Sequence, residues 1–175
     1  MKKILGLVVS LTAIAGVCAA VLAYVNALTG KPIAEMRVKK ANEAAMAVMP
    51  AGVKEVSGAD GFYVGKDASG KIAGYAVAGR DSGGYGGDIV LMVGFCADRE
   101  TVVCYKTLQA SETPGLGTKL STPEFSGQFA GRKVDSSLKV KADGGSIAAI
   151  TSATITSRAV CRAIEDARRN LAEAQ

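Results

Sequence analysis

The chain opens on a long apolar run. From Ile4 to Leu28 there is no charged residue, and almost every position holds an aliphatic or small side chain. A helix of that length rises about 37 Å, which crosses a hydrocarbon core of about 30 Å with some tilt. We therefore predict a retained transmembrane anchor over residues 1–30. The alternatives are a cleaved signal peptide and a lipoprotein signal ending at Cys18, but the apolar run continues well past that cysteine.

Helix-breaking residues follow the apolar run. Gly30 loosens the backbone and Pro32 lacks the N–H that an interior helical position needs, so we expect the span to end there. Residues 33–49 read as a second helix with a patchy apolar face, which Pro50 closes. Lysines and arginines flank both ends of the span, so the positive-inside rule leaves its orientation open.

Beyond Pro50 the apolar positions come in short runs between turn residues, a pattern typical of β-strands. The turns lie at 66–70 and 97–100, and a glycine-rich segment, residues 82–87, leads into the most apolar run. The expected strands cover four ranges: 61–64, 71–77, 89–93 and 101–108.

Helical patterns return in the last third of the chain. A short helical turn is expected over residues 123–130, and residues 157–172 form an amphipathic helix with an apolar side built on Val160, Ile164 and Leu171. The fold class is therefore α+β. It comprises one N-terminal transmembrane helix and a single domain, residues 31–175, with an antiparallel sheet and flanking helices.

The composition narrows the possible chemistry. Among 175 residues there is no histidine and no tryptophan, aromatic residues make up 5%, and the formal net charge is +5. Without histidine, a Ser-His-Asp triad, a Cys-His pair or an H-E-x-x-H zinc site cannot be built from this chain. The scattered basic residues and few aromatics are not typical of a surface that binds nucleic acid. We expect no catalytic and no metal-binding residues, and hence a bound cofactor or a binding role.

The four cysteines do not form a metal-binding pattern. No C-x-x-C spacing occurs, and Cys18 lies within the apolar span. Cys96 and Cys104 lie on successive predicted strands around a tight turn, so a disulfide between them is an alternative to two separate thiols. Cys161 falls near the apolar side of the last helix.

Six hydroxyl residues gather in front of the last predicted helix. Helix N-termini expose unpaired N–H groups and the positive end of a dipole, which together bind phosphate. The small side chain of Ala153 would let an anion approach the backbone, and Arg158 would add charge. The alternative interpretation is an ordinary helix cap. The hydroxyl residues are Ser146, Thr151, Ser152, Thr154, Thr156 and Ser157.

A second segment, residues 111–119, reads Ser-Glu-Thr-Pro-Gly-Leu-Gly-Thr-Lys. Pro114 fixes one backbone angle, while Gly115 and Gly117 permit conformations closed to other residues. Such a loop can turn several amides toward one planar ligand and present Leu116 to its face. Taken alone, the loop is equally consistent with a plain connection between elements.

Together the two segments resemble a known family. Glu112-Thr-Pro-Gly-Leu-Gly117 followed by Thr151-Ser-Ala-Thr154 is similar to the FMN-binding domain of the G subunit of the Rnf-type ion-translocating oxidoreductase complex. The related domain in the C subunit of the Na⁺-translocating NADH:quinone reductase is a close cousin. The resemblance runs through most of the chain, from the single span to the terminal helix.

The resemblance implies one FMN per chain, joined through its phosphate to the side chain of Thr154, the last residue of the motif. Ser152 stands where the family usually has glycine, and Ala148 where it usually has aspartate. Tyr85 in the glycine-rich turn is a weaker candidate for contact with the cofactor, and a structural role is the favoured interpretation. The other residues implied to bind the cofactor are Glu112, Thr113, Gly115, Leu116, Gly117, Thr118, Lys119, Thr151, Ser152, Ala153 and Thr156.

The same resemblance implies an electron-transfer subunit of a membrane complex that couples ferredoxin–NAD electron transfer to translocation of Na⁺ or H⁺. Its partners would be the other subunits, membrane lipid and a flavin transferase that attaches the FMN. The main domain would be extracytoplasmic, on a single-pass anchor in the cell membrane. Three alternatives are a flavoprotein of the quinone reductase, a stand-alone extracytoplasmic flavin reductase and a flavin-free anchored binding module.

Overall fold

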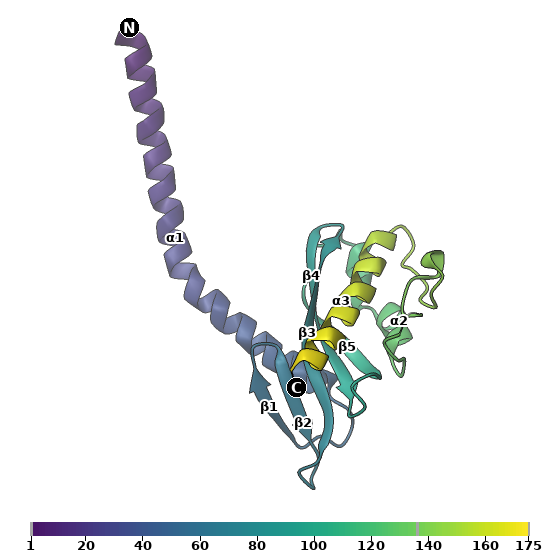
Figure 1. The fold of residues 1–175 in the computed structure, drawn as a ribbon. Coiled ribbons are helices and arrows are strands. Elements are labelled where there is room, and N and C mark those ends of the chain that lie inside the picture. The colour runs from purple at the N-terminus through teal and green to yellow at the C-terminus, as the bar shows by residue number, and fades with distance from the viewer. Residues whose placement is uncertain (1, 136, 175) are drawn as a thin grey trace. The chain divides into compact units, whose positions relative to one another are not determined.

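The computed structural model describes residues 2–135 and 137–174. The chain divides into two units, residues 1–39 and residues 40–175. A single helix, α1 (Lys2–Val48), supplies all the structure of the first unit and the first element of the second (Figure 1). By length and composition this helix can cross a membrane.

Helix α1 does not end where we expected. It continues through Gly30 and contains Pro32 in its interior, so the prediction of a break at these two residues is wrong. A proline removes one N–H···O bond and crowds the carbonyl four residues earlier, at a cost of about 3 kcal/mol. The residues on either side keep their own hydrogen bonds, and good helix formers such as Ala34 and Glu35 follow directly. One lost bond is therefore not sufficient to stop this helix.

The second unit is built on a five-stranded antiparallel sheet with the order β1-β2-β3-β4-β5. All four expected strands are present, but β3 extends far beyond its predicted end and pairs with β4 along the glycine-rich segment, where Gly84 lies opposite Gly87. The edge strand β1 was not predicted, because most of its side chains are exposed and show no apolar alternation. The strands are β1 (Glu55–Ala59), β2 (Phe62–Lys66), β3 (Ile72–Gly84), β4 (Gly87–Cys96) and β5 (Val102–Gln109).

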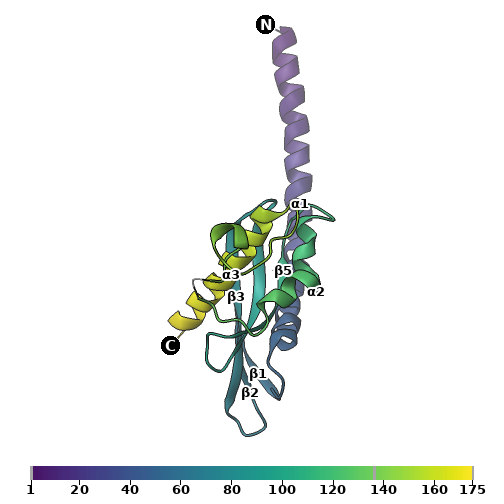
Figure 2. The same ribbon diagram turned by 90° about the vertical axis from the view of Figure 1, so that its right-hand side faces the viewer.

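Each face of the sheet has its own apolar core. On one face, helix α3 (Thr154–Glu173) packs across β3 and β4, as Figure 2 shows. Its apolar side joins Leu91, Val93 and Phe95 in the larger of the two cores. On the other face, the last turns of α1 contribute Ala45 and Val48 to a smaller core. Burial on both faces explains why β4 is the most apolar strand.

Helix α3 lies unusually close to β3. A Cβ atom at Gly79 would overlap the carbonyl oxygen of Ala163 and lie 2.7 Å from the nitrogen of Ala167. Two polar contacts reinforce this approach. The Arg80 N–H donates to Asp166 Oδ2 at 3.0 Å, and Asn170 Nδ2 donates to the Ala78 carbonyl at 3.1 Å. These contacts hold the middle and C-terminal half of α3 against β3.

Helix α3 begins at Thr154, three residues before the predicted start. Between β5 and α3 the described residues form four short helical turns, and isolated bridges pair Val140 with Ile147 and Lys133 with Thr101. The expected turn over residues 123–130 is present as two consecutive elements. The short elements are η1 (Gly117–Ser121), α2 (Pro123–Ser126), η2 (Gly127–Phe129) and η3 (Lys141–Asp143).

All four cysteines are free thiols. The register of β4 and β5 places Cys104 opposite Gly94 rather than opposite Cys96, which accounts for the missing disulfide. Cys161 is buried in the larger core, and desolvation raises the pKa of its thiol to about 12. It behaves as a small apolar residue of the core.

Candidate functional site

A cavity of about 470 Å³ opens at the N-terminus of α3. Three segments that are distant in the sequence form its wall: the β3–β4 turn, the loop after β5 and the first turn of α3. A volume of this size is typical of small-molecule sites. Its lining residues are Tyr85, Glu112, Thr113, Leu116, Gly117, Ser152, Ala153, Thr154, Ile155 and Thr156.

Large apolar side chains stand exposed around this cavity, one from each segment. Tyr85 is 72% exposed, Leu116 41% and Ile155 48%. Exposed apolar groups that share one cavity are unusual in a soluble domain and mark a binding surface for a partly apolar ligand. Of these three residues, sequence reasoning had assigned only Leu116 to the site, because neither an isolated tyrosine in a turn nor one isoleucine in a hydroxyl motif carries a distinctive pattern.

The N-terminus of α3 points its free N–H groups at the cavity. The N-cap is Ala153, which has no side-chain acceptor, so no protein cap satisfies the first turn. Among the described residues, no hydrogen bond is made by the N–H of Thr154, Ile155 or Thr156, whereas the Ser157 N–H donates to the Ala153 carbonyl at 3.0 Å. Unpaired donors at the positive end of a 20-residue helix favour an anion. Thr154, half-buried, is the first residue of this turn.

The Ser157 side chain bonds to the backbone on the buried side of the first turn of α3. Its hydroxyl donates to the Ala153 carbonyl at 2.9 Å and accepts from the Ile150 N–H at 2.9 Å. Both contacts are buried, so this side chain holds the segment before the helix and does not face the cavity. None of the hydroxyl residues therefore acts as an ordinary N-cap of α3, and Ser157 instead bonds to the backbone on both sides of the helix start.

Ser152 adopts a backbone conformation that favours glycine. Its φ is +62°, in the left-handed region. For residues other than glycine this conformation costs about 1–2 kcal/mol. Glycine is also the residue that the family resemblance implies at this position.

We expect Ser152→Gly to raise the free energy of unfolding by about 1 kcal/mol, because glycine adopts a positive φ without the Cβ penalty. Thermal unfolding of the purified chain measures this. Ser69→Gly, at an exposed turn where φ is not positive, is the matched control and should leave stability unchanged or slightly lower. A Ser152→Gly variant that unfolds at a lower temperature than the wild type would contradict the assignment of strain to this residue.

Glu112 and Thr156 form the inner wall. Thr156 is 0% exposed, and its hydroxyl donates to Glu112 Oε2 at 2.7 Å. The other carboxylate oxygen, Oε1, accepts from the Gly86 N–H at 3.3 Å. Thr156 lines the cavity, but its hydroxyl is already engaged by this carboxylate.

The remaining predicted residues lie beside the cavity rather than in its wall. Lys119 and Thr151 line a neighbouring cavity of about 300 Å³, together with residues of α2 and the segment 148–150. Gly115 and Thr118 line neither cavity. The Gly115 N–H donates to the Thr118 hydroxyl at 3.0 Å, so these two residues shape the loop.

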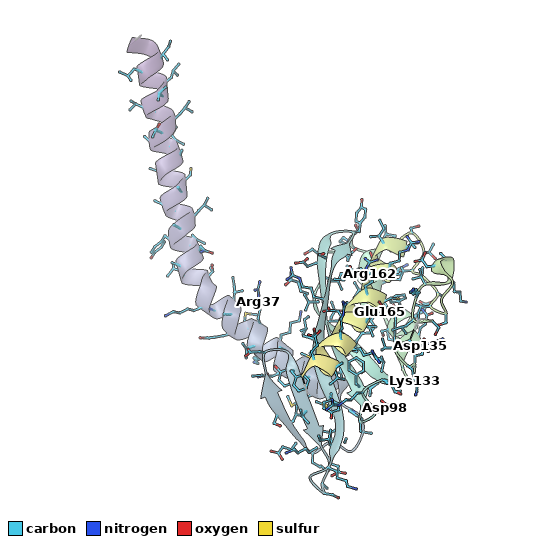
Figure 3. All side chains as sticks on the ribbon, in the orientation of Figure 1. Arg37, Asp98, Lys133, Asp135, Arg162 and Glu165 are labelled. Atoms are coloured by element: carbon cyan, nitrogen blue, oxygen red, sulfur yellow. The ribbon has the colours of Figure 1, made fainter. Side chains whose placement is uncertain are left out.

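Two ion pairs hold α3 to its surroundings. Arg162 makes two hydrogen bonds to Asp81 at 2.8 and 2.9 Å, and Arg158 makes two to Asp143, each at 2.7 Å. Arg158, which we expected to add charge for an anion, is thus paired with a carboxylate. Figure 3 shows Arg162 on α3, one turn before Glu165. Since Asp81 lies in β3 just before the turn that carries Tyr85, its ion pair ties that turn to the helix.

The Asp81–Arg162 pair makes stability depend on pH. Hydrogen bonds from the Arg162 guanidinium hold the pKa of Asp81 below its usual range, although partial burial opposes them. Because the folded pKa lies below the unfolded value of about 3.9, the contribution to stability is fully present above that pH. It is lost as the pH falls through the folded pKa.

We therefore expect Asp81→Asn to lower the midpoint of thermal unfolding at neutral pH, with a gap to the wild type that narrows as the pH falls below 4. Partial exposure of Arg162 means that salt will reduce the gap. Melting curves from acid to neutral pH test this. A gap of constant size across the titration would show that the charge of Asp81 is not its source.

The chain has relatives among known proteins. Residues 84–169 match the model of an FMN-binding domain, a range that includes all three cavity segments. The chain is 35% identical to the G subunit of the ion-translocating oxidoreductase complex of Methanosarcina acetivorans, over 95% of this chain and 93% of that protein. It is 33% identical to the G subunit of the proton-translocating ferredoxin:NAD(+) oxidoreductase complex of Clostridium ljungdahlii, over 84% and 80%.

A solved structure shares the fold. The crystal structure of NqrC from Shewanella oneidensis superposes with a TM-score of 0.52 at 21% identity, over 76% of this chain and 73% of that one. The agreement concerns the arrangement of sheet and helices. It confirms the predicted fold class, with a long apolar N-terminal helix, an antiparallel sheet and flanking helices.

Proposed function

Because the chain belongs to the G-subunit family of ion-translocating oxidoreductase complexes, we propose that it carries FMN joined by a phosphoester to Thr154 and passes electrons within such a complex. The coarser part follows from the family: an FMN-binding, electron-transfer subunit of an oxidoreductase, which is not catalytic alone. The attachment at Thr154 is the part that the cavity supports and that experiment must decide.

The residues around the cavity fit a flavin mononucleotide at both ends. The unpaired N–H groups of the first turn of α3 suit a phosphate, since they supply donors and a positive dipole end at one point. The exposed apolar side chains of Tyr85, Leu116 and Ile155 suit a planar, largely apolar ring. These two features occur in one cavity of about 470 Å³. That juxtaposition is the observation that carries the proposal.

Thr154 is the hydroxyl best placed for the bond. It is the first helical residue, half-buried and part of the cavity wall. Of the nearby hydroxyls, Thr156 is bound to Glu112 and Ser157 to the backbone. Thr151 lines the neighbouring cavity, and Ser152, which also lines this one, lies before the helix and outside its first turn.

The chain does not supply a base for this attachment. An aliphatic hydroxyl is a weak nucleophile unless a base or metal activates it. There is no histidine in the sequence, and the carboxylate in the cavity wall accepts from Thr156 instead. A separate flavin transferase would therefore catalyse the transfer from a flavin dinucleotide. In that transfer the Thr154 oxygen would bond to the phosphorus of the flavin half, the pyrophosphate P–O bond would break to release the nucleoside monophosphate, and the hydroxyl proton would pass to the transferase.

Once bound, FMN supplies the redox chemistry, and the chain supplies binding and orientation. The first turn of α3 would hold the phosphate through backbone N–H groups. Leu116 and Tyr85 would cover the apolar ring and exclude water. Glu112, buried in the wall, adds a carboxylate whose oxygens are both occupied by protein donors.

Membrane association is supported by the long apolar helix and by the family. We take residues 1–30 as the anchor and residues 31–175 as the FMN-binding domain, placed on the extracytoplasmic side as the family resemblance implies. Lipid would then contact the anchor, and the other members of the complex would contact the chain on this side.

Protease added to intact spheroplasts should remove the domain. A fully protected domain would contradict this orientation.

The experiment for the function is a redox titration of the purified full-length chain, co-expressed with a flavin transferase. The proposal expects flavin absorbance that bleaches on reduction and returns on reoxidation, and that stays with the chain after denaturation. The opposite outcome is a colourless chain, although the transferase in the same cells loads another flavoprotein. That result would overturn the proposal and favour a flavin-free binding module.

A further inference from the structure

We propose that Glu112 is a positioning residue that fixes the rotation of the first turn of α3 through Thr156, so that Thr154 faces the cavity. The part that concerns attachment rests on the proposed function, whereas the part that concerns the helix does not. Glu112 is suited to this role because its carboxylate touches all three segments that build the cavity wall.

The first observation is the burial of a carboxylate without a cationic partner. Glu112 is 7% exposed, and among the described residues none of the ion pairs includes it. A buried charge is costly unless hydrogen bonds satisfy it. Two donors do so: the Thr156 hydroxyl at 2.7 Å and the Gly86 N–H at 3.3 Å. The position of this carboxylate is therefore set by the two donors that satisfy it.

The second observation is the space left for this carboxylate. A Cβ at Gly84 would lie 2.8 Å from Glu112 Oε1, and a Cβ at Gly117 would lie 2.5 Å from Oε2. Both distances are shorter than real Cβ contacts. The β3–β4 turn and the loop after β5 therefore close around the carboxylate only because these two positions lack side chains.

The third observation is helix geometry. Successive residues of an α-helix are rotated by about 100°, so residues two apart point to nearly opposite sides. Both residues contribute to the cavity wall, but Thr156 is fully buried with its hydroxyl on Glu112, whereas Thr154 is half-buried. The hydrogen bond that Thr156 donates to Glu112 therefore sets the direction of Thr154, although Glu112 has no hydrogen bond to Thr154 itself.

Glutamine can replace the carboxylate only in one orientation of its amide. The Gly86 N–H can only donate and therefore requires the amide oxygen, whereas the Thr156 hydroxyl can accept from the NH₂ group instead of donating. We therefore expect Glu112→Gln to keep both contacts, with the hydrogen bond to Thr156 reversed, and to leave α3 in place.

The test combines amide hydrogen exchange of the flavin-free full-length chain with the yield of covalent flavin after incubation with transferase, flavin dinucleotide and Mg²⁺. The decisive variants are Thr156→Val, which removes the donor at nearly constant volume, and Thr156→Ser, which restores it. Glu55→Gln, an exposed change on β1, is the control for loss of a carboxylate.

We expect Thr156→Val to exchange about tenfold faster at the amides of residues 157–159 and to load flavin about tenfold more slowly, as loss of one buried hydrogen bond implies. Thr156→Ser and Glu55→Gln should behave like the wild type, and residues 91–93 in β4 should stay protected in every variant. The double variant of Glu112→Ala and Thr156→Val should be no worse than the poorer single variant.

The proposal is overturned if Thr156→Val exchanges and loads like the wild type. It is overturned equally if β4 loses protection to the same extent, because Glu112 would then stabilise the whole domain and not the helix start. If the wild-type chain takes up no flavin, the proposed function fails, while the exchange at residues 157–159 still decides whether Glu112 positions the helix.

Discussion

Thr154→Ala is expected to abolish the covalent flavin completely, because this substitution removes the only atom through which the phosphate would be tied to the chain. The helix should still form, since alanine is the better helix former at this position. The cavity keeps its N–H donors and its apolar side chains, so a weak, reversible affinity for free FMN should remain. Fluorescence of the band on a denaturing gel measures the covalent fraction.

Two controls make the result specific. Thr107→Ala removes a half-buried threonine on β5 whose hydroxyl contacts Ser121 at 2.9 Å, far from the helix start in the sequence, and should leave the band unchanged. Thr154→Ser keeps a hydroxyl and should keep the band, at a lower yield. A fluorescent Thr154→Ala band as strong as that of the wild type would show that the flavin is attached elsewhere.

Gly79→Ala is expected to destabilise the domain strongly. The new Cβ would overlap the Ala163 carbonyl and lie 2.7 Å from the Ala167 nitrogen, and both are backbone atoms of α3 that cannot rotate away. Helix and strand must separate, which we expect to lower the free energy of unfolding by about 3 kcal/mol, at the upper end of typical overpacking. For a domain of this size that corresponds to roughly 10 °C in the unfolding midpoint.

The consequence should extend to the site. Helix α3 carries Thr154 at its start, and Gly79 lies beneath its middle. Displacing the helix should therefore reduce flavin loading at temperatures where the variant is still folded. Gly127→Ala is the matched control, because no atom lies within 4 Å of its Cβ position and its φ is −63°. Equal melting temperatures for Gly79→Ala and the wild type would contradict the close packing of α3 on β3.

The sequence was most informative where local chemistry is distinctive. Pro and Gly in the loop after β5 and the hydroxyl run before α3 each stood out, and both segments contribute to the cavity wall. Their meeting could not be derived locally, since Glu112 and Thr156 are 44 residues apart and Gly86 and Glu112 are 26 apart. It was the family resemblance, confirmed by the relatives, that joined the two motifs into one site.

The errors have physical causes. The break at Pro32 was overestimated because one missing N–H does not outweigh the bonds on both sides. The start of α3 was placed three residues late because Thr154, Ile155 and Thr156 are β-branched and disfavour helix on their own. In the folded domain the Thr156 hydroxyl bonds to Glu112, and tertiary contact of this kind overrides a weak local preference.

The most direct measurement is the mass and fragmentation of one tryptic peptide from the wild-type chain. Cleavage after Lys141 and Arg158 releases residues 142–158, which contain Thr154 and the five other hydroxyls of the segment. The account predicts a gain equal to FMN minus water, with the fragment ions placing it on Thr154. An unmodified peptide in full yield, or the same gain on another of these hydroxyls, would contradict it.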